Sequence, residues 1–556
     1  MYKKSIVLSY SSFYDDKPLE LSQYISNIDR DILLDYAIWY CNIKDTSDIY
    51  YGFLKPKDEG TEFYRHFTTR ANQILSTNND VSIINTRSSL CFLEQVLALP
   101  QKEIYRKTTD VEVRECIFKA YLTLGSIVSE MRDFPDDEPF ENITLQNALH
   151  FELYREHNFL DQILIQTIKA ITFFQYAERK LSTHLDVFLK KYNLTSWEVY
   201  ITRLSQILFL IGTDDKKPHS SFSIAKNDIT YNQKATFLKN FCLPIQYDID
   251  QDFTRIKSEP IIYRANRDNY NVLYKPFLTD KIYNSLYFIF KEINQSFEGQ
   301  DNFIPNNIFR RDIGLDFSEK YLLKNVMQRT FRSKYKHLCY EELTGLGMPD
   351  YYLRNGNKVI LIENKDNLVS KQILDKYDVY EFINYVRDRM MNKGSKPKAC
   401  CQLLNNIGNI LSLDQNTEKW EYDNALKTNK CIFYPVIVVN QPAYSITAIN
   451  YIVNNWFKEE AQRRSLDESR IMNVTIINID SLIKYKTIFR APKTSLYKMI
   501  EEFWSESGKY HLENCNTELD IPIEMMHSYR SFDTFMFEKF GVNTLTTQDV
   551  EVYLGR

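Results

Sequence analysis

The chain has 556 residues and a formal net charge of −4, with 44% hydrophobic and 26% charged residues. This length exceeds the span of a single hydrophobic core, so we expect about two to four domains. A protein that coats nucleic acid regardless of sequence is strongly basic, so the charge argues against that class and any positive surface must be local. The scarcity of Gly (14) and Pro (16) favours long helices over a sandwich of short strands.

Nine cysteines are scattered along the chain without a Cys-x-x-Cys pair, and the only neighbours among them are Cys400 and Cys401. An odd number at irregular spacing in a large chain indicates reduced thiols of an intracellular protein. The apolar run near the start, residues 6–8, is too short for a signal peptide, and no stretch approaches about 18 uninterrupted apolar residues. We therefore expect a cytoplasmic protein without a membrane partner.

Residues 1–212 are expected to form a mainly helical domain that serves in sensing, targeting or oligomerisation. Apolar residues recur at helical spacing in four stretches, residues 29–43, 113–131, 159–181 and 195–212. Thr195 or Ser196 would cap the last of these helices. No repeat of fixed period is present, so a solenoid is not supported. The polar residues 213–221 are expected to form a loop or boundary.

Residues 222–298 form either a small α+β module or the last part of the N-terminal region. Two strands are expected within 259–277, on either side of the turn Asn266-Arg267-Asp268-Asn269, followed by a helix over 279–294. Residues 296–307 have the composition of a linker.

Residues 308–490 are expected to form one domain, because their predicted helices and strands follow a recognisable order. Residues 491–556 are expected to form a helical C-terminal extension. We expect helix 316–336, strand 337–343, strands 349–354 and 358–365, helix 369–391, a basic loop 392–398, strand 431–439, a further helix and strand 474–483. Asn355-Gly356 between strands is a strong local signal for a hairpin turn. This order, with a nearly all-apolar strand late in the series, predicts a mixed sheet covered by helices on both faces.

Charged residues converge at one end of the predicted hairpin. Asp350 begins its first strand, and Glu363 and Lys365 end its second strand. Alternation along a strand places Glu363 and Lys365 on one face, with Asn364 on the other, and the hairpin returns Asp350 to the side of Glu363. Charges at the end of an apolar strand need a compensating partner, and a divalent cation between the two carboxylates is a natural one.

The pattern Pro349-Asp350, hairpin, Glu363-Asn364-Lys365 resembles the PD-(D/E)xK phosphodiesterase superfamily, over about residues 319–482. That superfamily includes restriction endonucleases, RecB-type nucleases and Holliday-junction resolvases. The resemblance implies an α/β fold (α+β for the whole chain), in which a mainly helical N-terminal region precedes a restriction-endonuclease-like mixed-sheet domain flanked by helices, the nuclease domain of residues 308–490. It also implies Mg²⁺ or Mn²⁺ held by Asp350, Glu363 and Asn364. Lys365 would orient the attacking water or stabilise charge developing on the phosphate.

A glutamate from the first helix belongs to the site in many members, and Glu319 is the expected one here. Its rivals are Glu341 and Glu342, just ahead of the hairpin. Glu319 could also be only the N3 member of a capping box begun by Asp316. In some members a glutamine on the helix after the lysine assists, and Gln372 occupies that place.

Local positive charge suits a phosphate-bearing substrate. Residues 320–336 are rich in Lys and Arg, and Lys393, Lys396 and Lys398 form a second basic segment close to the predicted site. The expected contacts to nucleic acid are Lys324, Arg329, Arg332, Lys336 and Lys393. Such runs also occur as solvated helix faces.

Taken together, these patterns predict a metal-dependent endonuclease that acts on DNA. Its place in a prokaryotic defence or restriction system is expected from the domain architecture alone. The alternatives are an inactive nuclease-like subunit that binds nucleic acid or protein, and a nuclease acting on RNA or branched DNA. No phosphate-binding loop of the Gly-x-x-x-x-Gly-Lys-Ser/Thr type is present. We therefore expect a homo-oligomer or a subunit of a multiprotein system in which a partner supplies any ATPase.

Overall fold

The structure is a computed structural model. It describes residues 6–43, 52–77, 81–100, 109–128, 135, 137–153, 159–212, 220–244, 247–250, 252–331, 335–344, 347–374, 376, 378–415, 419–509, 520–541 and 545–554. The chain forms two compact units that alternate along the sequence. Unit 1 comprises Met1–Phe134, Tyr154–Phe159 and Leu189–Ser285, and unit 2 comprises Pro135–Leu153, Leu160–Phe188 and Leu286–Arg556.

Unit 1 is mainly helical, as the apolar periodicity predicts. Its elements are β1 (Ile6–Val7), η1 (Tyr10–Ser12), α1 (Leu21–Ile25), α2 (Arg30–Cys41), η2 (Pro56–Asp58), α3 (Glu62–Thr77), β2 (Val81–Ser82), α4 (Thr86–Ala98), α5 (Asp110–Val128), α9 (Trp197–Gly212), β3 (Ser221–Phe222), α10 (Tyr231–Lys239), α11 (Thr254–Ser258), β4 (Ile261–Arg264), β5 (Asn269–Val272) and α12 (Lys275–Thr279). The expected hairpin within 259–277 is confirmed as β4 and β5, and β3 adds a third antiparallel strand to β5.

One hydrophobic core joins the early and late parts of unit 1. It extends from Leu8 through the buried faces of α2, α4 and α5, and it includes Tyr247 and Phe277 from the late part. The amide of Asn42 adds a polar link, since it donates to the carbonyl of Leu273 at 3.1 Å and accepts from the backbone N–H of Lys275. The segment after residue 222 therefore packs with the N-terminal helices up to Ser285.

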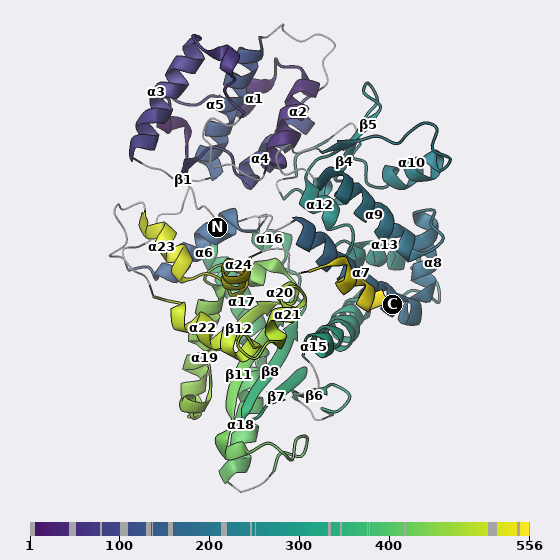
Figure 1. Cartoon of the computed structure of the whole chain (residues 1–556), viewed down its shortest axis with the longest axis vertical. Coiled ribbons are helices and arrows are strands. Elements are labelled where there is room, and N and C mark those ends of the chain that lie inside the picture. The colour runs from purple at the N-terminus through teal and green to yellow at the C-terminus, as the bar shows by residue number, and fades with distance from the viewer. Residues whose placement is uncertain are drawn as a thin grey trace. The chain divides into compact units, whose positions relative to one another are not determined.

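Unit 2 contains the remaining elements (Figure 1). They are α6 (Phe140–Phe151), most of α7 (Phe159–Lys180) and α8 (Ser182–Lys191), α13 (Leu286–Ser296), α14 (Asn306–Asp312), η3 (Ile313–Leu323), α15 (Lys324–Thr330), β6 (Lys336–Cys339), β7 (Tyr351–Asn355), β8 (Lys358–Lys365), α16 (Lys371–Leu374), α17 (Val379–Met390), β9 (Asn392–Lys393), β10 (Lys396–Pro397), α18 (Ala399–Gln415), η4 (Thr428–Lys430), β11 (Ile432–Val439), η5 (Pro442–Tyr444), α19 (Ile449–Arg463), η6 (Glu468–Arg470), β12 (Thr475–Asn478), α20 (Ile479–Lys484), α21 (Lys486–Arg490), α22 (Leu496–Glu506), α23 (Asp520–Ser528), α24 (Phe532–Phe540) and α25 (Thr547–Leu554).

A mixed sheet of five strands, in the order β12-β11-β8-β7-β6, forms the centre of unit 2. Strands β6, β7 and β8 are antiparallel, whereas β8, β11 and β12 are parallel, as the apolar strand at 431–439 suggested. In Figure 1 these strands lie side by side among the helices of the unit. The carboxyl ends of β8, β11 and β12 therefore meet at one edge, where Lys365, Val439 and Asn478 are in register.

The hairpin of β7 and β8 turns one residue later than the Asn355-Gly356 pair predicts. Asn355 pairs with Lys358, so Gly356 and Asn357 are the two central residues of the turn. Gly356 has a φ of 64° while Asn357 has a negative φ, the pattern of a type II′ turn with glycine first. A turn centred on Asn355-Gly356 would place Asp350 opposite Leu361, whereas the observed register continues to Asp350 opposite Glu363.

Four further elements of unit 2 differ from the sequence-based expectation. The single helix predicted over 369–391 is two helices, α16 and α17, because the Asp378 carboxylate accepts the N–H groups of Tyr380 and Glu381 and begins α17 there. The loop at 392–398 is a hairpin of β9 and β10. The sequence analysis missed α18, and the strand predicted over 474–483 ends at Asn478, whose side chain caps α20.

Helices cover both faces of the sheet, as predicted. Helix α18 packs on β8 and β11, and the π-helical segment η3 contacts β8 through Ser318. Helices α19, α20 and α24 contact β12. Segments α14, η3 and α15 follow one another without a break from Asn306 to Thr330, so the helix begins ten residues before Asp316.

The cysteines agree with the expectation of reduced thiols. The eight cysteines in the described part of the chain are free, and Cys400 and Cys401 are buried. Within the described residues, no helix combines the length and the apolar character needed to cross a bilayer.

Candidate active site

Asp350 and Glu363 lie opposite each other at the end of the β7–β8 hairpin. The last paired residues are Tyr351 and Ile362, and the two acids come next on their strands. Asp350 Oδ2 accepts a hydrogen bond from the backbone N–H of Asn364 at 2.7 Å. This hydrogen bond fixes one oxygen of the Asp350 carboxylate against the end of β8.

Glu363 and Lys365 form an ion pair on the same face of β8, as strand alternation predicts. Lys365 Nζ lies 2.9 Å from Glu363 Oε2, and the two side chains are 14% and 1% exposed. Burial alone would lower the pKa of Lys365, but the charges of Glu363 and Asp350 raise it above the ordinary value. The ammonium therefore stays charged and is held at the carboxyl end of the strand.

Glu319 on η3 joins these residues, and the structure favours it over its rivals. Burial and then repulsion by Asp350 raise the pKa of Glu319 to about 9, with Lys365 opposing the shift. By contrast, Glu341 is exposed and paired with Lys324, and Glu342 is exposed and accepts from the backbone N–H of Cys339. Glu319 belongs to the same charged cluster as Asp350, Glu363 and Lys365.

The proposed capping box of Asp316 and Glu319 is wrong. Both residues lie within η3, which continues α14, so no helix begins between them. Asp316 instead pairs with Lys320 at 2.7 Å, one turn further along the helix. The role of Glu319 must therefore come from its neighbours at the sheet edge and not from a helix start.

Acidic groups outnumber basic groups at this edge of the sheet. Burial, together with the charge of Asp350, raises the pKa of Glu363 to about 8, and Lys365 only partly offsets the effect. Burial also raises the pKa of Asp350, against Lys365 and the Asn364 N–H. Three carboxyls thus share one ammonium, and an added cation would favour the ionised form of each carboxyl.

The donor set fits a divalent cation. Glu363 Oε1 is buried and has no hydrogen-bond partner, which leaves one carboxylate oxygen unused beside Asp350. Mg²⁺ prefers oxygen ligands and is commonly held by one or two carboxylates while it retains several waters. Asp350 and Glu363 could hold the ion directly, and Glu319 could contact it or one of its waters.

Asn364, the third predicted metal ligand, directs its side chain to the opposite face of β8. Its Nδ2 donates to Ser318 Oγ at 3.0 Å, so only its backbone carbonyl remains for a metal on the Glu363 face. Ser318 Oγ also accepts from Asn440 Nδ2 at 2.6 Å. All three side chains are buried, and this polar cluster ties η3, β8 and the end of β11 together behind the site.

Sequence analysis also missed Asp366, the residue after Lys365. Arg310 on α14 donates to its backbone carbonyl and lies 3.6 Å from its Oδ2. Burial raises the pKa of Asp366, with Arg310 as the main opposing charge. An acid directly after Glu-x-Lys was visible in the sequence, but its arginine partner is 56 residues away and no local pattern connects them.

One other group of ligand-type atoms occurs in the described part of the chain. Cys339, Glu341 and Glu342 offer atoms that all lie within 4.8 Å of one another. The Cys339 thiol lies 3.0 Å from Glu342 Oε2, and Glu341 pairs with Lys324. Each residue of the group therefore already has a partner, either within the group or in Lys324. Among the described residues, the ligand atoms of Glu319, Asp350 and Glu363 do not form a group of this kind.

The first basic segment does not gather at the site. Lys324 pairs with Glu341 at 2.7 Å, and Arg329 donates to the carbonyl of Val552 and stacks on Tyr553. Lys336 begins β6 opposite Arg354, at the turn end of the hairpin and away from Asp350. Arg332 lies outside the described residues. Contacts of these residues to nucleic acid remain predictions.

Lys393 and Gln372, two further residues predicted from the sequence, are both exposed. Lys393 is exposed in the β9–β10 hairpin, and Lys398 next to it lies close enough to Lys365 for repulsion to contribute to its lowered pKa. Gln372 is exposed on α16, and its assisting role also remains a prediction.

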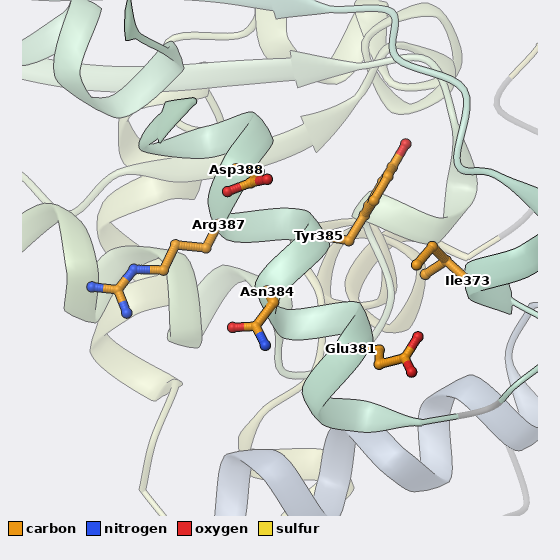
Figure 2. Close-up of a pocket in the computed structure, with 6 residues that line it drawn as sticks. All are labelled: Ile373, Glu381, Asn384, Tyr385, Arg387 and Asp388. Carbon is orange, nitrogen blue, oxygen red and sulfur yellow. The ribbon is translucent and has the colours of Figure 1, made fainter. Parts of the chain in front are cut away.

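A shallow depression lies on helix α17, beside the loop that follows Lys365. Figure 2 shows its lining side chains, Ile373, Glu381, Asn384, Tyr385, Arg387 and Asp388. The hydroxyl of Tyr385 donates to the carbonyl of Leu368 at 2.8 Å, which connects α17 to that loop. None of the four charged residues of the candidate site lines the depression.

The chain matches no family model, no curated protein and no solved structure in the three comparisons made. The geometry of the site is therefore the basis for its interpretation.

Proposed function

We propose that unit 2 is a Mg²⁺- or Mn²⁺-dependent endonuclease that hydrolyses phosphodiester bonds of DNA, with a site of the PD-(D/E)xK type. The observation that carries the proposal is the convergence of Asp350, Glu363 and Glu319 on Lys365 at the carboxyl end of β8. A cluster of one buried and two half-buried carboxyls that share one ammonium is costly for stability alone. It is the arrangement expected of a site that binds a cation and a phosphate together.

Each residue has a role that its position supports. A divalent cation between Asp350 and Glu363 would polarise the scissile phosphate and promote ionisation of an attacking water. Lys365 Nζ, held by Glu363, is placed to donate a hydrogen bond to that water or to the phosphate oxygen that gains charge. The Asn364 N–H holds one oxygen of the Asp350 carboxylate at the end of β8. Glu319, whose raised pKa favours its protonated form, can accept a proton once a cation lowers that pKa.

The proposal is tested with the full chain and several nucleic acids. Plasmid, linear duplex and single-stranded DNA, and RNA of the same sequence, are incubated with Mg²⁺, Mn²⁺ or EDTA. We expect cleavage of DNA with a divalent cation and none with EDTA. The variants Asp350→Asn and Lys365→Ala should abolish it. Glu341→Gln is the matched control, because Glu341 is an exposed acid outside the charged cluster.

The other outcomes distinguish the alternative functions. Binding of DNA without cleavage under any condition would indicate an inactive nuclease-like subunit. Cleavage of RNA alone would assign the same chemistry to a ribonuclease. Cleavage that persists in both Asp350→Asn and Lys365→Ala would place the activity elsewhere and overturn the proposed site.

A further inference from the structure

The short hairpin of β9 and β10 carries a lysine on each strand. Lys393 pairs with Lys396 and Asn392 pairs with Pro397, around the two-residue turn Gly394-Ser395. Gly394 has a φ of 60°, a conformation that glycine adopts without strain. Residues 392–397 are all exposed, and the N–H of Lys398 donates to the carbonyl of Met391 at 2.8 Å to close the base of the hairpin.

Positive charge on this hairpin is not balanced by acids. Within the described part of the chain, no ion pair or hydrogen bond involves the ammonium groups of Lys393, Lys396 and Lys398. Arg389, at the end of α17, stacks on Tyr385 at 5.0 Å and adds a further cation nearby. Like charges gathered on one small element repel one another, so an anionic partner would relieve that repulsion.

The hairpin lies next to the candidate active site. Burial lowers the pKa of Lys398, and repulsion by Lys365 and then by Arg389, Lys396 and Lys393 lowers it further. Helix α18 begins directly after Lys398 and packs on β8. In its first turn Cys400 is buried and interacts electrostatically with Lys365 and Glu363. The basic groups therefore continue from Lys365 outward to the exposed hairpin.

We propose that the β9–β10 hairpin, through Lys393 and Lys396, binds the phosphodiester backbone of DNA and guides it to the carboxylates of Asp350 and Glu363. This inference rests on the proposed function for its choice of DNA. The positive charge, the exposure of both lysines and the position of Lys398, at the base of the hairpin and within electrostatic reach of Lys365, support a backbone contact. Lysine ammonium groups bind phosphates as point charges without reading sequence, so the contact would raise affinity for all DNA sequences alike.

The test measures binding separately from cleavage. Fluorescence anisotropy with a labelled DNA duplex of mixed sequence, in EDTA, gives Kd over a series of salt concentrations for the full chain. We expect Lys393→Gln/Lys396→Gln to weaken binding at least about tenfold, and to reduce the slope of log Kd against log salt by about 1.8, since each phosphate contact contributes about 0.9. Lys393→Arg/Lys396→Arg, which retains the charge, should keep most of the affinity.

A matched control removes two exposed lysines that lie outside the hairpin. Lys493 and Lys498 are exposed, and Lys498 lies near Glu501, which pairs with Lys358 at the start of the strand. Lys493→Gln/Lys498→Gln should leave Kd and the salt slope unchanged. An equal loss of affinity in this control would show a general charge effect and overturn the inference.

The outcomes also separate this inference from the proposed function. If the hairpin variant binds as tightly as the wild type, the inference fails, whatever the cleavage assay shows. If binding depends on the hairpin but the wild type cleaves nothing with Mg²⁺ or Mn²⁺, the nuclease proposal fails and the hairpin contact stands. Binding to RNA of the same sequence but not to DNA would overturn the assignment of DNA as the partner.

Discussion

Asp350 Oδ2 accepts the backbone N–H of Asn364 at 2.7 Å, and this contact depends on where the hairpin turns. With Gly356 and Asn357 at the centre of the turn, the register continues to Asp350 opposite Glu363. Adjacent carboxylates at a hairpin end are unfavourable without a cation. Burial raises the pKa of each acid, and the negative charge of one acid raises the pKa of its neighbour. The turn therefore sets both the geometry and the electrostatic strain of the site.

Replacing Asp350 with Asn should separate the charge of this residue from its structural hydrogen bond. The Asn amide oxygen can still accept the Asn364 N–H, so the hairpin is retained, but an expected metal ligand is lost. We expect the rate of DNA cleavage with Mg²⁺ to fall at least about 100-fold, since even residues behind the ligands contribute about 10- to 100-fold. Plasmid cleavage and the Tm should be measured together. A lower cleavage rate with a Tm equal to or above that of the wild type would show that the charge of Asp350, and not its hydrogen bond, supports cleavage. An unchanged cleavage rate would contradict the prediction.

Binding of a divalent cation should become tighter as the pH rises. Burial and neighbouring negative charge raise the pKa of Glu363 to about 8 and that of Glu319 to about 9, so protons compete with a cation for these carboxyls near pH 7. A carboxyl must lose its proton to become a ligand, so affinity for Mn²⁺ should increase from about pH 6.5 to about pH 8.5 with release of protons. Isothermal titration calorimetry in buffers of different ionisation enthalpy measures both quantities.

The variant Glu319→Gln serves as the control for this pH dependence. It removes one of the two titrating groups, so fewer protons should be released while Mn²⁺ still binds. If the affinity of the wild type for Mn²⁺ did not change with pH, the arrangement of carboxyls described above would be contradicted.

Ser318→Ala should loosen the link between η3 and the strands of the site. Ser318 Oγ accepts from the buried amides of Asn364 and Asn440, and the loss of an acceptor for a buried donor costs about 1–3 kcal/mol. We expect a lower Tm and a change in the pH profile of cleavage, because Glu319, the next residue, would no longer be held beside Asp350. Ser318→Thr, which keeps the hydroxyl, should restore the profile. A lower Tm with an unchanged profile would limit Ser318 to a structural role.

Glu94 should make unit 1 less stable at high pH. Its side chain is 2% exposed and accepts from the Tyr247 hydroxyl, and burial raises its pKa from 4.5 to about 7. The folded state holds the proton more tightly than the unfolded state, so this contribution is fully present below about pH 4.5 and is lost as the pH rises through about 7. Glu94→Gln should therefore raise the Tm relative to the wild type at about pH 8 but not at about pH 5.

Thermal unfolding followed by circular dichroism at both pH values checks the Glu94 prediction. Glu62→Gln, at an exposed position on α3, is the matched control and should show no such pH-dependent difference. A Glu94→Gln variant that is equally destabilised at both pH values would contradict the prediction and assign Glu94 a hydrogen-bonding role alone.

Much of the candidate site was predictable because its signals are local. Alternation along 358–365 put Glu363 and Lys365 on one face, and the glycine near the turn returned Asp350 to that end. Both signals depend on backbone geometry within a few residues, which any sequence with the same pattern shares. The apolar strand at 431–439 likewise indicated a buried parallel strand beside β8.

Other features depended on packing between distant segments, and only the tertiary structure decided them. The choice of Glu319 over Glu341 followed from the path of a helix that begins at Asn306. Contacts between separate elements were also not predictable: Asp366 pairs with Arg310, and Ser318 accepts from Asn364 and Asn440. In this protein the sequence by itself determined which charged residues share the end of a hairpin. The tertiary structure decided which others join them, because that choice depends on how buried helices and strands exclude water around unpaired charge.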